Sequence, residues 1–245
     1  MPSLAESCII PDWPAPARVR ACVTTRAGGV SVGPFTSLNL GDHVGDDPQA
    51  VAENRRRLVA ELGCRPAWLR QVHGTRVVEA DPAQVAEADG CWTAAPGIAC
   101  SSMTADCLPV LFCDRAGSRV AAAHAGWRGL AGGVLEATLE ALALPAEQVL
   151  AWLGPAIGPQ AFEVGPEVRE AFLASHPEAA QAFVPSHNPG KFLADLYQLA
   201  RIRLVARGIT AVYGGGFCTF SDPRFFSYRR AARTGRFASL VWLQP

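Results

Sequence analysis

Long hydrophobic segments are absent from this 245-residue sequence. No uninterrupted apolar run approaches the roughly 20 residues that a membrane-spanning helix needs. The first 20 residues contain no basic stretch followed by an apolar one, and early prolines interrupt them, so no secretory signal peptide is predicted. These absences predict a soluble, cytoplasmic protein that does not act in a membrane.

An excess of charge of either sign is also missing. Lysine and arginine total 22, aspartate and glutamate total 22, and the formal net charge is zero. Because there is no basic surplus to neutralise a run of phosphates, general nucleic-acid binding is disfavoured. A local basic pocket for one small anion is still compatible with this balance.

Closely spaced cysteine pairs are the third absence. The chain has eight cysteines but no C-x-x-C pair. In a chain of this length without an export signal, neither a disulfide framework nor a four-cysteine zinc site is expected. Most of these thiols are therefore predicted to be small buried hydrophobic groups.

The composition favours one large domain with a mixed α/β or α+β fold. Hydrophobic residues make up 49% of the chain, which is enough for a substantial core. Strand-like and helix-like segments alternate, so helices are expected to cover the sheets. Residues 1–17 are interrupted by prolines and are expected to wrap the surface. We therefore predict a single domain over residues 1–245.

Local patterns place the individual elements. Strands are predicted at residues 19–24, 69–78 (a strand or hairpin bent at His73-Gly74), 98–124 (two or three strands), 149–154, 210–213, 225–229 and 237–243. Helices are predicted from Pro48 to Gly63 with Asp47 as the N-cap, a few residues after His124, near Pro166, and from Asp195 to Gly208. The Asp195…Gln198 pair resembles a capping box.

Three soft metal ligands lie at the ends of predicted strands. His73 is in "QVHGT", Cys107 in "ADCLP" and His124 in "AHAGWRG", each beside a bend that contains glycine or proline. Spacings of 34 (107 − 73) and 17 (124 − 107) do not match a zinc finger, but they suit ligands gathered from different strands at one rim of a sheet. Zn²⁺ prefers thiolate and imidazole, and three such ligands leave the fourth tetrahedral position open, as in catalytic sites.

Glycines crowd the start of the helix predicted after His124, although glycine disfavours helix formation. They are Gly126, Gly129, Gly132 and Gly133. Their cost makes sense if the backbone must approach a ligand closely. Free N–H groups at a helix start also favour anions.

The same three ligand residues allow two other interpretations. They could be ordinary core residues beside a tight strand-to-helix turn. Alternatively, Cys107 could be a nucleophile activated by His124 or His73, with its thiolate stabilised by an imidazolium or a helix N-terminus. Spacing does not separate metal ligation from nucleophilic catalysis, because both place the sulfur beside imidazoles.

Two loops near the N-terminus carry polar side chains. "TTRAGGVS" and "SLNLGDHVGDD" contain Arg26, Asn39, Asp42 and His43. Arg26 beside a glycine-rich turn could hold phosphate, although a lone loop arginine is more often solvated.

A basic cluster lies near the C-terminus, in "FFSYRRAARTGRF". Arg229, Arg230 and Arg236 could complete an anion pocket there or cover an edge strand. Phe162, in the Gly- and Pro-rich stretch "LGPAIGPQAFEVG", could stack on a flat base, although core packing is the commoner role of such a side chain.

The stretches "TADCLP" and "HAGWRG" together are highly specific. Further stretches follow a known family order from about residue 20 to residue 243: "TTRAGGVS", "SLNLGDHVGDDP", "QVHGTRV", "ADG", "LGPAIGPQAFEVG", "DLYQLAR" and "FFSYRR…TGRFASLVWL". Together they resemble the laccase-domain family. These are the YfiH-like proteins once called polyphenol oxidases and now regarded as purine nucleoside phosphorylases.

The resemblance implies a layered α/β/β/α sandwich, also described as a cysteine-hydrolase fold. It implies that His73, Cys107 and His124 bind the metal, zinc, and are catalytic. It further implies phosphate-dependent cleavage of adenosine, inosine and 5′-methylthioadenosine, and hydrolytic deamination of adenosine. Copper-dependent oxidation of phenols is the family's older assignment, so copper is a second candidate metal. The partners would be a nucleoside and phosphate, and no oligomeric state is indicated.

The residues can support this chemistry. For deamination, zinc acidifies the water that attacks C6 of adenine, and Asp106 could move the proton or support a ligand. Phosphorolysis needs an anion pocket and stabilisation of an oxocarbenium-like sugar. The candidates for that pocket are Arg26, Asn39, Arg229 and Arg230.

Three alternatives accompany this prediction. The first is a cysteine hydrolase that attacks an amide or ester with Cys107. The second is a copper phenol oxidase, but multicopper sites need about ten His and Cys ligands, and the chain has five histidines, so efficient laccase chemistry is not expected. The third is a non-catalytic binding module that unfolds when its metal is removed.

Overall fold

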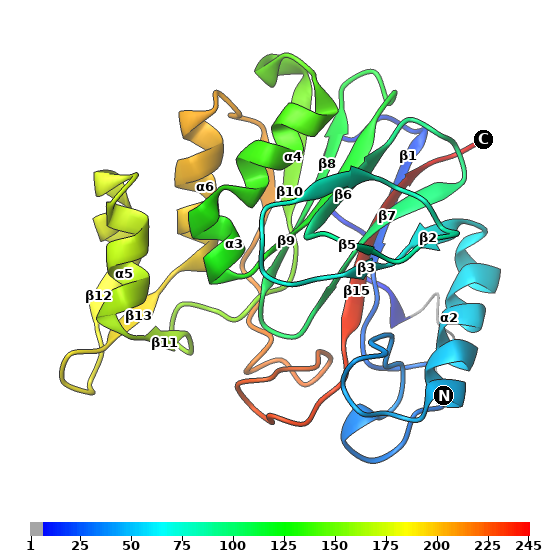
Figure 1. The fold of residues 1–245 in the computed structure, drawn as a ribbon, viewed down its shortest axis with the longest axis horizontal. Coiled ribbons are helices and arrows are strands. Elements are labelled where there is room, and N and C mark those ends of the chain that lie inside the picture. Colours follow the sequence, from blue (N-terminus) through cyan, green and yellow to red (C-terminus); the bar gives the residue numbers. More distant parts are fainter. Residues whose placement is uncertain (1–6) are drawn as a thin grey trace.

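The computed structural model describes residues 7–245, so the prediction for the N-terminal segment lies outside the described residues for positions 1–6. Two sheets pack face to face, with helices on the outer face of each (Figure 1). The layers follow the order helix, sheet, sheet, helix. This arrangement confirms the predicted mixed α/β class and its α/β/β/α layering.

One sheet has four strands. Their spatial order is β1 (Val19–Val23), β15 (Phe237–Leu243), β7 (Ile98–Thr104) and β2 (Arg65–Ala67). The outer face is covered by α2 (Pro48–Leu62), whose Leu58 packs into a core with Leu240. As predicted, the Asp47 side chain accepts the N–H of Gln49 at the start of α2, and Gly63 ends it in the left-handed region, with φ 64°.

The other sheet has six strands. Their spatial order is β14 (Val212–Gly214), β10 (Val149–Leu153), β8 (Leu108–Asp114), β9 (Val120–Ala125), β6 (Gly90–Thr93) and β4 (Val77–Glu79). Every residue of β8, β9 and β10 is buried. Both faces of this sheet are covered, which explains why its central strands read as nearly continuous apolar runs.

Helices α3 (Trp127–Gly132) and α4 (Val134–Leu142) pack on the free face of the six-stranded sheet, and α6 (Leu196–Ala206) packs beside α4 (Figure 1). Helix α5 (Pro166–Leu173) lies farther out, beside α3. The Asp195 carboxylate accepts the N–H groups of Tyr197 and Gln198 at the start of α6, while its own N–H donates to Ala182. Half of the predicted capping box is therefore present: Asp195 caps the helix, but the Asp195 N–H bonds to Ala182 and not to the Gln198 side chain.

The single helix predicted after His124 is wrong in one respect, because two helices follow. Gly133 has φ 103°, so it ends α3 and precedes α4. A residue in this left-handed conformation breaks the helical hydrogen-bond ladder, and glycine adopts it without a steric penalty. The apolar stripe still faces the sheet, since Leu130, Val134 and Leu135 are fully buried.

Shorter elements complete the fold. They are β3 (Leu69–Arg70) with β5 (Ala86–Glu87), the small sheet β11 (Glu163–Val164), β13 (Phe192–Ala194) and β12 (Phe183–Pro185), and the 3₁₀ turns η1 (Gly33–Phe35), η2 (Ala146–Gln148) and η3 (Pro177–Ala182). Residues 69–78 form no hairpin, because β3 pairs with β5 and β4 pairs with β6. The predicted bend at His73 is present, and His73 has φ 62°.

The strand predicted at residues 225–229 is wrong. This segment forms turns, in which the N–H of Phe225 donates to Asp222 and the N–H of Ala231 donates to Ser227. Phe225 and Phe226 are fully buried in the core between the two sheets. The apolar run therefore reflects side-chain burial from a loop and not strand pairing.

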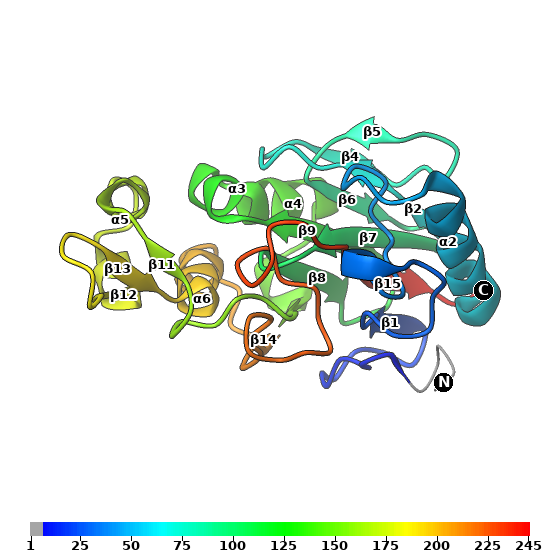
Figure 2. The same ribbon diagram turned by 90° about the horizontal axis from the view of Figure 1, so that it is seen from below.

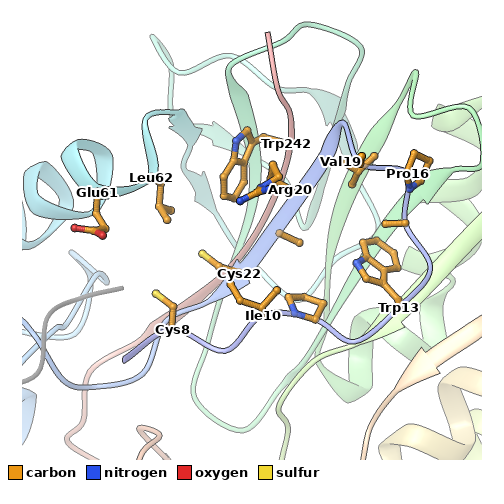
Figure 3. A pocket seen from close by; sticks show the side chains of 14 residues that line it. Cys8, Ile10, Trp13, Pro16, Val19, Arg20, Cys22, Glu61, Leu62 and Trp242 are labelled. Carbon is orange, nitrogen blue, oxygen red and sulfur yellow. The ribbon is translucent and has the colours of Figure 1, made fainter. Parts of the chain in front are cut away.

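The described part of the N-terminal segment runs along the outside of β1, where Ile9 exchanges two backbone hydrogen bonds of 2.8 Å with Val23. Between this segment, β1 and the end of α2 lies a cavity of about 420 Å³. Figure 3 shows Cys8, Trp13 and Trp242 among its lining side chains. No histidine is among the residues that line it.

All eight cysteines are free thiols, and most are buried, as predicted. The exceptions are the partly exposed Cys8, Cys107 and Cys218. Among the described helices, none combines the length and the apolar character that a bilayer crossing would require.

The long connections between β1 and α2 (blue) and between β14 and β15 (orange to red) lie at the same end of the two sheets (Figures 1 and 2). The turns that follow β7 and β10 contribute side chains to the same cavity as these connections. Loops that are distant in sequence therefore meet at one rim of the sandwich.

Candidate active site

The structure brings His73, Cys107 and His124 together at this rim. His73 lies between β3 and β4, Cys107 in the turn between β7 and β8, and His124 in β9. One ligand atom from each lies within 4.8 Å of the other two. The Cys107 Sγ is 3.8 Å from the His73 Nε2, and the two imidazole centroids are 4.8 Å apart in an edge-to-face arrangement.

This spacing fits a soft metal ion. Zn–S and Zn–N bonds in a tetrahedral site place neighbouring ligand atoms about 3.3–3.6 Å apart. The observed 3.8 Å separation of Cys107 Sγ and His73 Nε2 is close to that range. No other group of three or more His, Cys, Asp or Glu side chains in the described part of the chain meets the same distance criterion. These three side chains could therefore hold one metal ion.

Asp89 orients two of the three ligands. Its Oδ1 accepts from the His124 Nδ1 at 2.8 Å and from the His73 backbone N–H at 2.9 Å. Its Oδ2 accepts from the backbone N–H groups of Gly74, at 2.7 Å, and Val72, at 3.2 Å. A carboxylate on Nδ1 leaves Nε2 of His124 as the ligand atom, which is a usual arrangement behind metal-binding histidines. Asp89 is 1% exposed, so these bonds also satisfy a buried charge.

Two site residues have left-handed backbone conformations that are uncommon outside glycine. His73 has φ 62° and Asp106 has φ 92°. The Asp89 carboxylate anchors the backbone N–H of His73. Asp106 accepts the Thr219 hydroxyl and the Arg229 N–H, each at 2.6 Å. Strained residues held by surrounding bonds are typical of functional sites.

The Cys107 thiol has an unusual acidity. Burial alone raises the pKa of a thiol, and it raises that of Cys64 to about 11 and that of Cys113 to about 12. Burial acts in the same direction at Cys107, but the charge of His124 and hydrogen bonds to His124 and His73 outweigh it, and its pKa falls to about 6.

The His124 imidazole shifts in the complementary direction. Burial lowers its pKa, but the Cys107 thiolate and the Asp89 carboxylate outweigh burial and raise the pKa to about 9. The protein's own charges and hydrogen bonds, considered without a metal ion, therefore favour a Cys107 thiolate paired with a His124 imidazolium at neutral pH. The thiolate is the form of cysteine that binds metals and attacks electrophiles.

Gly126 provides the space that the ligands need. A Cβ at this position would lie 2.7 Å from Cδ2 of His73 and 3.1 Å from Sγ of Cys107. The backbone conformation is ordinary, with φ −61°, so steric room and not conformational freedom requires glycine here. The close backbone approach predicted from the glycine-rich sequence is present at this residue.

We expect the Gly126→Ala variant to bind zinc about 10-fold to 100-fold more weakly, because the added methyl displaces the His73 ring from its ligating position. Competition with a chromophoric chelator measures this affinity. Gly132→Ala is the matched control, since Gly132 is exposed in the same short helix and its added Cβ would only meet Cγ2 of Thr75, at 3.2 Å. Equal zinc affinities for the two variants would contradict the expectation.

The ligands lie in a cavity of about 390 Å³. It is lined by His43, Gln71, His73, Met103, Thr104, Ala105, Asp106, Cys107, His124, Ile157, Phe162, Tyr228, Arg229 and Arg236. Apolar and aromatic side chains form much of its wall, which suits an aromatic ligand of moderate size.

The Gln71 amide is already occupied. Its Nε2 donates to the Met103 carbonyl and its Oε1 accepts the Met103 N–H, both at 2.8 Å. The side chain thus braces the cavity wall, and its amide has little capacity left for reading the edge of a bound base.

Two of the predicted phosphate ligands lie outside this cavity. Asn39 is fully buried, and its amide bonds to Gly41, Asp46 and the Arg236 N–H, so it organises the loop before α2. The Arg26 guanidinium donates to the Thr36 carbonyl at 2.8 Å. The side chains of Arg26 and Asn39 therefore stabilise the β1–α2 connection through hydrogen bonds to its backbone.

The other two predicted phosphate ligands differ from each other. Arg230 donates to backbone carbonyls of residues 219–225 and does not line the cavity. Arg229 does line it, and its Nη1 donates to the Ala161 and Glu163 carbonyls. Of the four candidates, Arg229 alone reaches the described cavity wall.

Sequence reasoning missed Asp89 as a site residue. The available signal is a carboxylate in "EADGCW", directly before a buried strand, where an unpaired charge would be costly. Its partner His124 is 35 residues away, so only strand pairing shows that the two meet. Arg236, which the sequence places in a basic cluster that could complete an anion pocket, and His43, a loop residue, both line the cavity, although neither is among the four predicted phosphate ligands.

Fold and site together define a class: layered α/β proteins that gather a thiolate and two imidazoles at the end of an apolar cavity. Residues 20–244 match the family described as "Multi-copper polyphenol oxidoreductase laccase". The chain belongs to this family, which confirms the laccase-domain resemblance.

Two relatives have names that describe an activity. The chain is 73% identical over 237 residues to "Purine nucleoside phosphorylase PA4543" of Pseudomonas aeruginosa, covering 96% of this chain and 98% of the relative. It is 55% identical over 240 residues to "Purine nucleoside phosphorylase YfiH" of Escherichia coli, with the same coverage. Both names describe enzymes and therefore support an enzyme here.

Solved structures agree with the fold. The crystal structure of Neisseria meningitidis protein NMB0706 superposes with a TM-score of 0.94 at 53% identity, covering 98% of this chain and all of that one. Bacillus licheniformis hypothetical protein YfiH gives a TM-score of 0.86 at 30% identity, covering 92% of this chain and 93% of that one.

Proposed function

We propose that this protein is a zinc-dependent purine nucleoside phosphorylase that cleaves adenosine, inosine and 5′-methylthioadenosine with phosphate and also deaminates adenosine. The observation that carries the proposal is the convergence of His73, Cys107 and His124 on the 390 Å³ cavity. The names of the close relatives support the phosphorylase part of the proposal. The partners are then small molecules, and a cytoplasmic location stays a prediction from the sequence.

The donor set and its surroundings suit a catalytic metal. Zinc held by one thiolate and two imidazoles supplies Lewis acidity, which polarises an oxygen and acidifies water. The protein's own part is to hold its ligands in place through Asp89 and the space at Gly126. His124 is 4% exposed, so this side of the site is closed to bulk water.

The cavity wall accounts for the acceptance of more than one purine. Phe162, Tyr228, Ile157 and Met103 offer apolar and aromatic surface. Such surfaces stack on any base, because every base has a π-face. The Gln71 amide donates one hydrogen bond to Met103 and accepts another, so its orientation is fixed by the backbone and not by a bound base. We therefore assign the base to this wall, beside the three metal ligands.

The test is a product analysis of zinc-replete protein with each of the three nucleosides, with and without phosphate. We expect free base from each nucleoside only when phosphate is present, and inosine from adenosine in either condition. Chelation should remove both activities and zinc should restore them. Zinc-replete protein that releases neither base nor inosine would overturn the proposal. A non-catalytic module would instead unfold on chelation.

A second candidate function rests on a specific observation. Cys107, His124 and Asp89 form the nucleophile–base–carboxylate arrangement of cysteine hydrolases, and the pKa of Cys107 is about 6. Chelated protein that still hydrolyses an ester, and forms a covalent adduct at Cys107, would favour this function over the first.

Multicopper oxidation is not supported, despite the description of the family. Such sites need about ten His and Cys ligands, whereas one group of three gathers in the described residues. Copper at the same three ligands is tested by loading the chelated protein with copper and measuring oxidation of a phenol.

A further inference from the structure

Arg236 is held rigidly at the edge of the catalytic cavity. It directly precedes β15, its N–H donates to the Asn39 Oδ1 at 2.8 Å, and its carbonyl accepts the Leu40 N–H at 3.0 Å. Its aliphatic stem lies against Gly41, where an added Cβ would come within 2.8 Å of the Arg236 Cγ. Backbone and stem are therefore fixed, and the side chain lines the cavity beside Cys107.

The Arg236 guanidinium lacks a counter-ion in the protein. Its Nη1 donates to the carbonyls of Thr234, at 3.2 Å, and Gly235, at 3.0 Å. No ion pair of the described residues includes Arg236. The nearby negative groups that act on its charge are Cys107 and Asp106. A partly buried cation without a paired carboxylate is costly, and an anionic ligand would compensate it.

Asp106 is bonded to other groups and forms no direct ion pair with Arg236 among the described residues. Its Oδ1 accepts the Thr219 hydroxyl and its Oδ2 accepts the Arg229 N–H, both at 2.6 Å. These bonds tie the carboxylate to the 219–229 loop. The donors of Arg236 that have no partner among the described residues, Nε and Nη2, are therefore left for a ligand.

Other groups on the same wall favour an anion. His43 and Arg229 line the cavity together with Arg236. Burial and then the positive charge of Arg236 lower the pKa of His43, while the neighbouring Asp42 acts in the opposite direction, and the His43 ring can offer a hydrogen bond to a ligand. Arg229 adds a second cation, although two backbone carbonyls already accept bonds from its Nη1. Arg236 is thus the cation with the freer donors beside the metal ligands.

We propose that Arg236 is the principal binding residue for the phosphate co-substrate, an inference that rests on the proposed function. The guanidinium matches a phosphate with two parallel donors. In the reaction, a hydrogen phosphate oxygen bonds to the anomeric carbon as the bond from that carbon to N9 breaks. The electron pair goes to the purine, which receives the proton that phosphate gives up. The products are ribose 1-phosphate and free base.

The test compares R236Q, R236K and R233Q with the native protein, all zinc-replete. Arg233 is the matched control, because it is an exposed arginine of the same loop and lies over Phe35, outside the cavity. We expect R236Q to raise the KM for phosphate and the Kd for inorganic phosphate measured by calorimetry about 10-fold or more. R236Q should raise the nucleoside KM less than the phosphate KM, and R233Q should keep phosphorolysis and phosphate-independent deamination within about twofold of native.

R236K keeps the positive charge but lacks the planar guanidinium with its parallel donors. Its phosphate affinity should lie between those of the native protein and R236Q, a graded result that a simple folding defect would not give. Native phosphate affinity in R236Q, or an equal loss in R233Q, would overturn the assignment. If calorimetry shows phosphate binding through Arg236 but no nucleoside releases its base, the anion site stands and the phosphorylase proposal fails.

Discussion

Replacing Cys107 with alanine is expected to remove the bound metal and to lower kcat/KM for phosphorolysis about 10³-fold or more. The variant keeps only two of the three protein ligands, which are both imidazoles. Cys107→Ser should behave in the same way, because a serine hydroxyl is not ionised at neutral pH, whereas the pKa of the Cys107 thiol is about 6. Metal content per chain and base release from adenosine measure the two effects.

Cys8→Ala is the control for this experiment. Cys8 is also a partly exposed thiol, but it lines the 420 Å³ cavity beside β1, where it lies next to Cys22 (Figure 3). The control should keep native zinc content and native kcat/KM. Full zinc occupancy together with full activity in Cys107→Ala would contradict both metal ligation and nucleophilic catalysis by this residue.

Asp89→Asn should weaken zinc binding about 10-fold to 100-fold without changing any ligand. The amide retains one acceptor oxygen where the carboxylate has two, and its NH₂ group would face donors of the 72–74 backbone or His124. Charged hydrogen bonds are lost in a buried site, so the free energy of unfolding should fall by about 1.5–3 kcal/mol. Chelator competition and thermal unfolding measure the two quantities.

Asp114→Asn separates the two effects of the Asp89 substitution. Asp114 is equally buried and holds the turn after β8, where it accepts the backbone N–H groups of Ser118 and Arg119. It lies at the opposite end of β8 from Cys107. This variant should lose stability but keep native zinc affinity. If Asp89→Asn loses stability and retains its zinc affinity, Asp89 has only a structural role.

Short sequence patterns correctly predicted the helix ends that are fixed by interactions between residues close in the chain. Asp47, Pro48 and Gly63 bound α2 as expected, because caps and helix stops act through hydrogen bonds a few residues apart. Two of the differences between prediction and structure have one physical source. The sequence pattern predicts one helix through Gly133 and a strand at residues 225–229, and neither is present. Apolar residues signal burial, but they do not tell which backbone conformation delivers it.

The candidate site divides in the same way. Residue type and position beside strand ends predict three metal ligands, and the structure brings these three side chains together. The phosphate candidates were less well predicted, because arginine serves both as a ligand and as a brace for loop carbonyls. Arg230 and Arg236 lie six residues apart in one loop, yet Arg230 holds the 219–225 backbone and Arg236 lines the cavity. Nothing in their local sequence separates these roles.

By itself, the sequence determined which side chains are capable of the chemistry: one thiol, two imidazoles, and glycines beside one of the imidazoles. The tertiary structure alone decided what surrounds them. Pairing of β6 with β9 sets Gly90 opposite Ala123 and so brings Asp89 to His124, and the packing of the β14–β15 connection brings Arg236 to Cys107. Residue type and local spacing can be read directly from the sequence. Contacts between residues that are distant in the sequence depend instead on strand register and on the packing of the sheets.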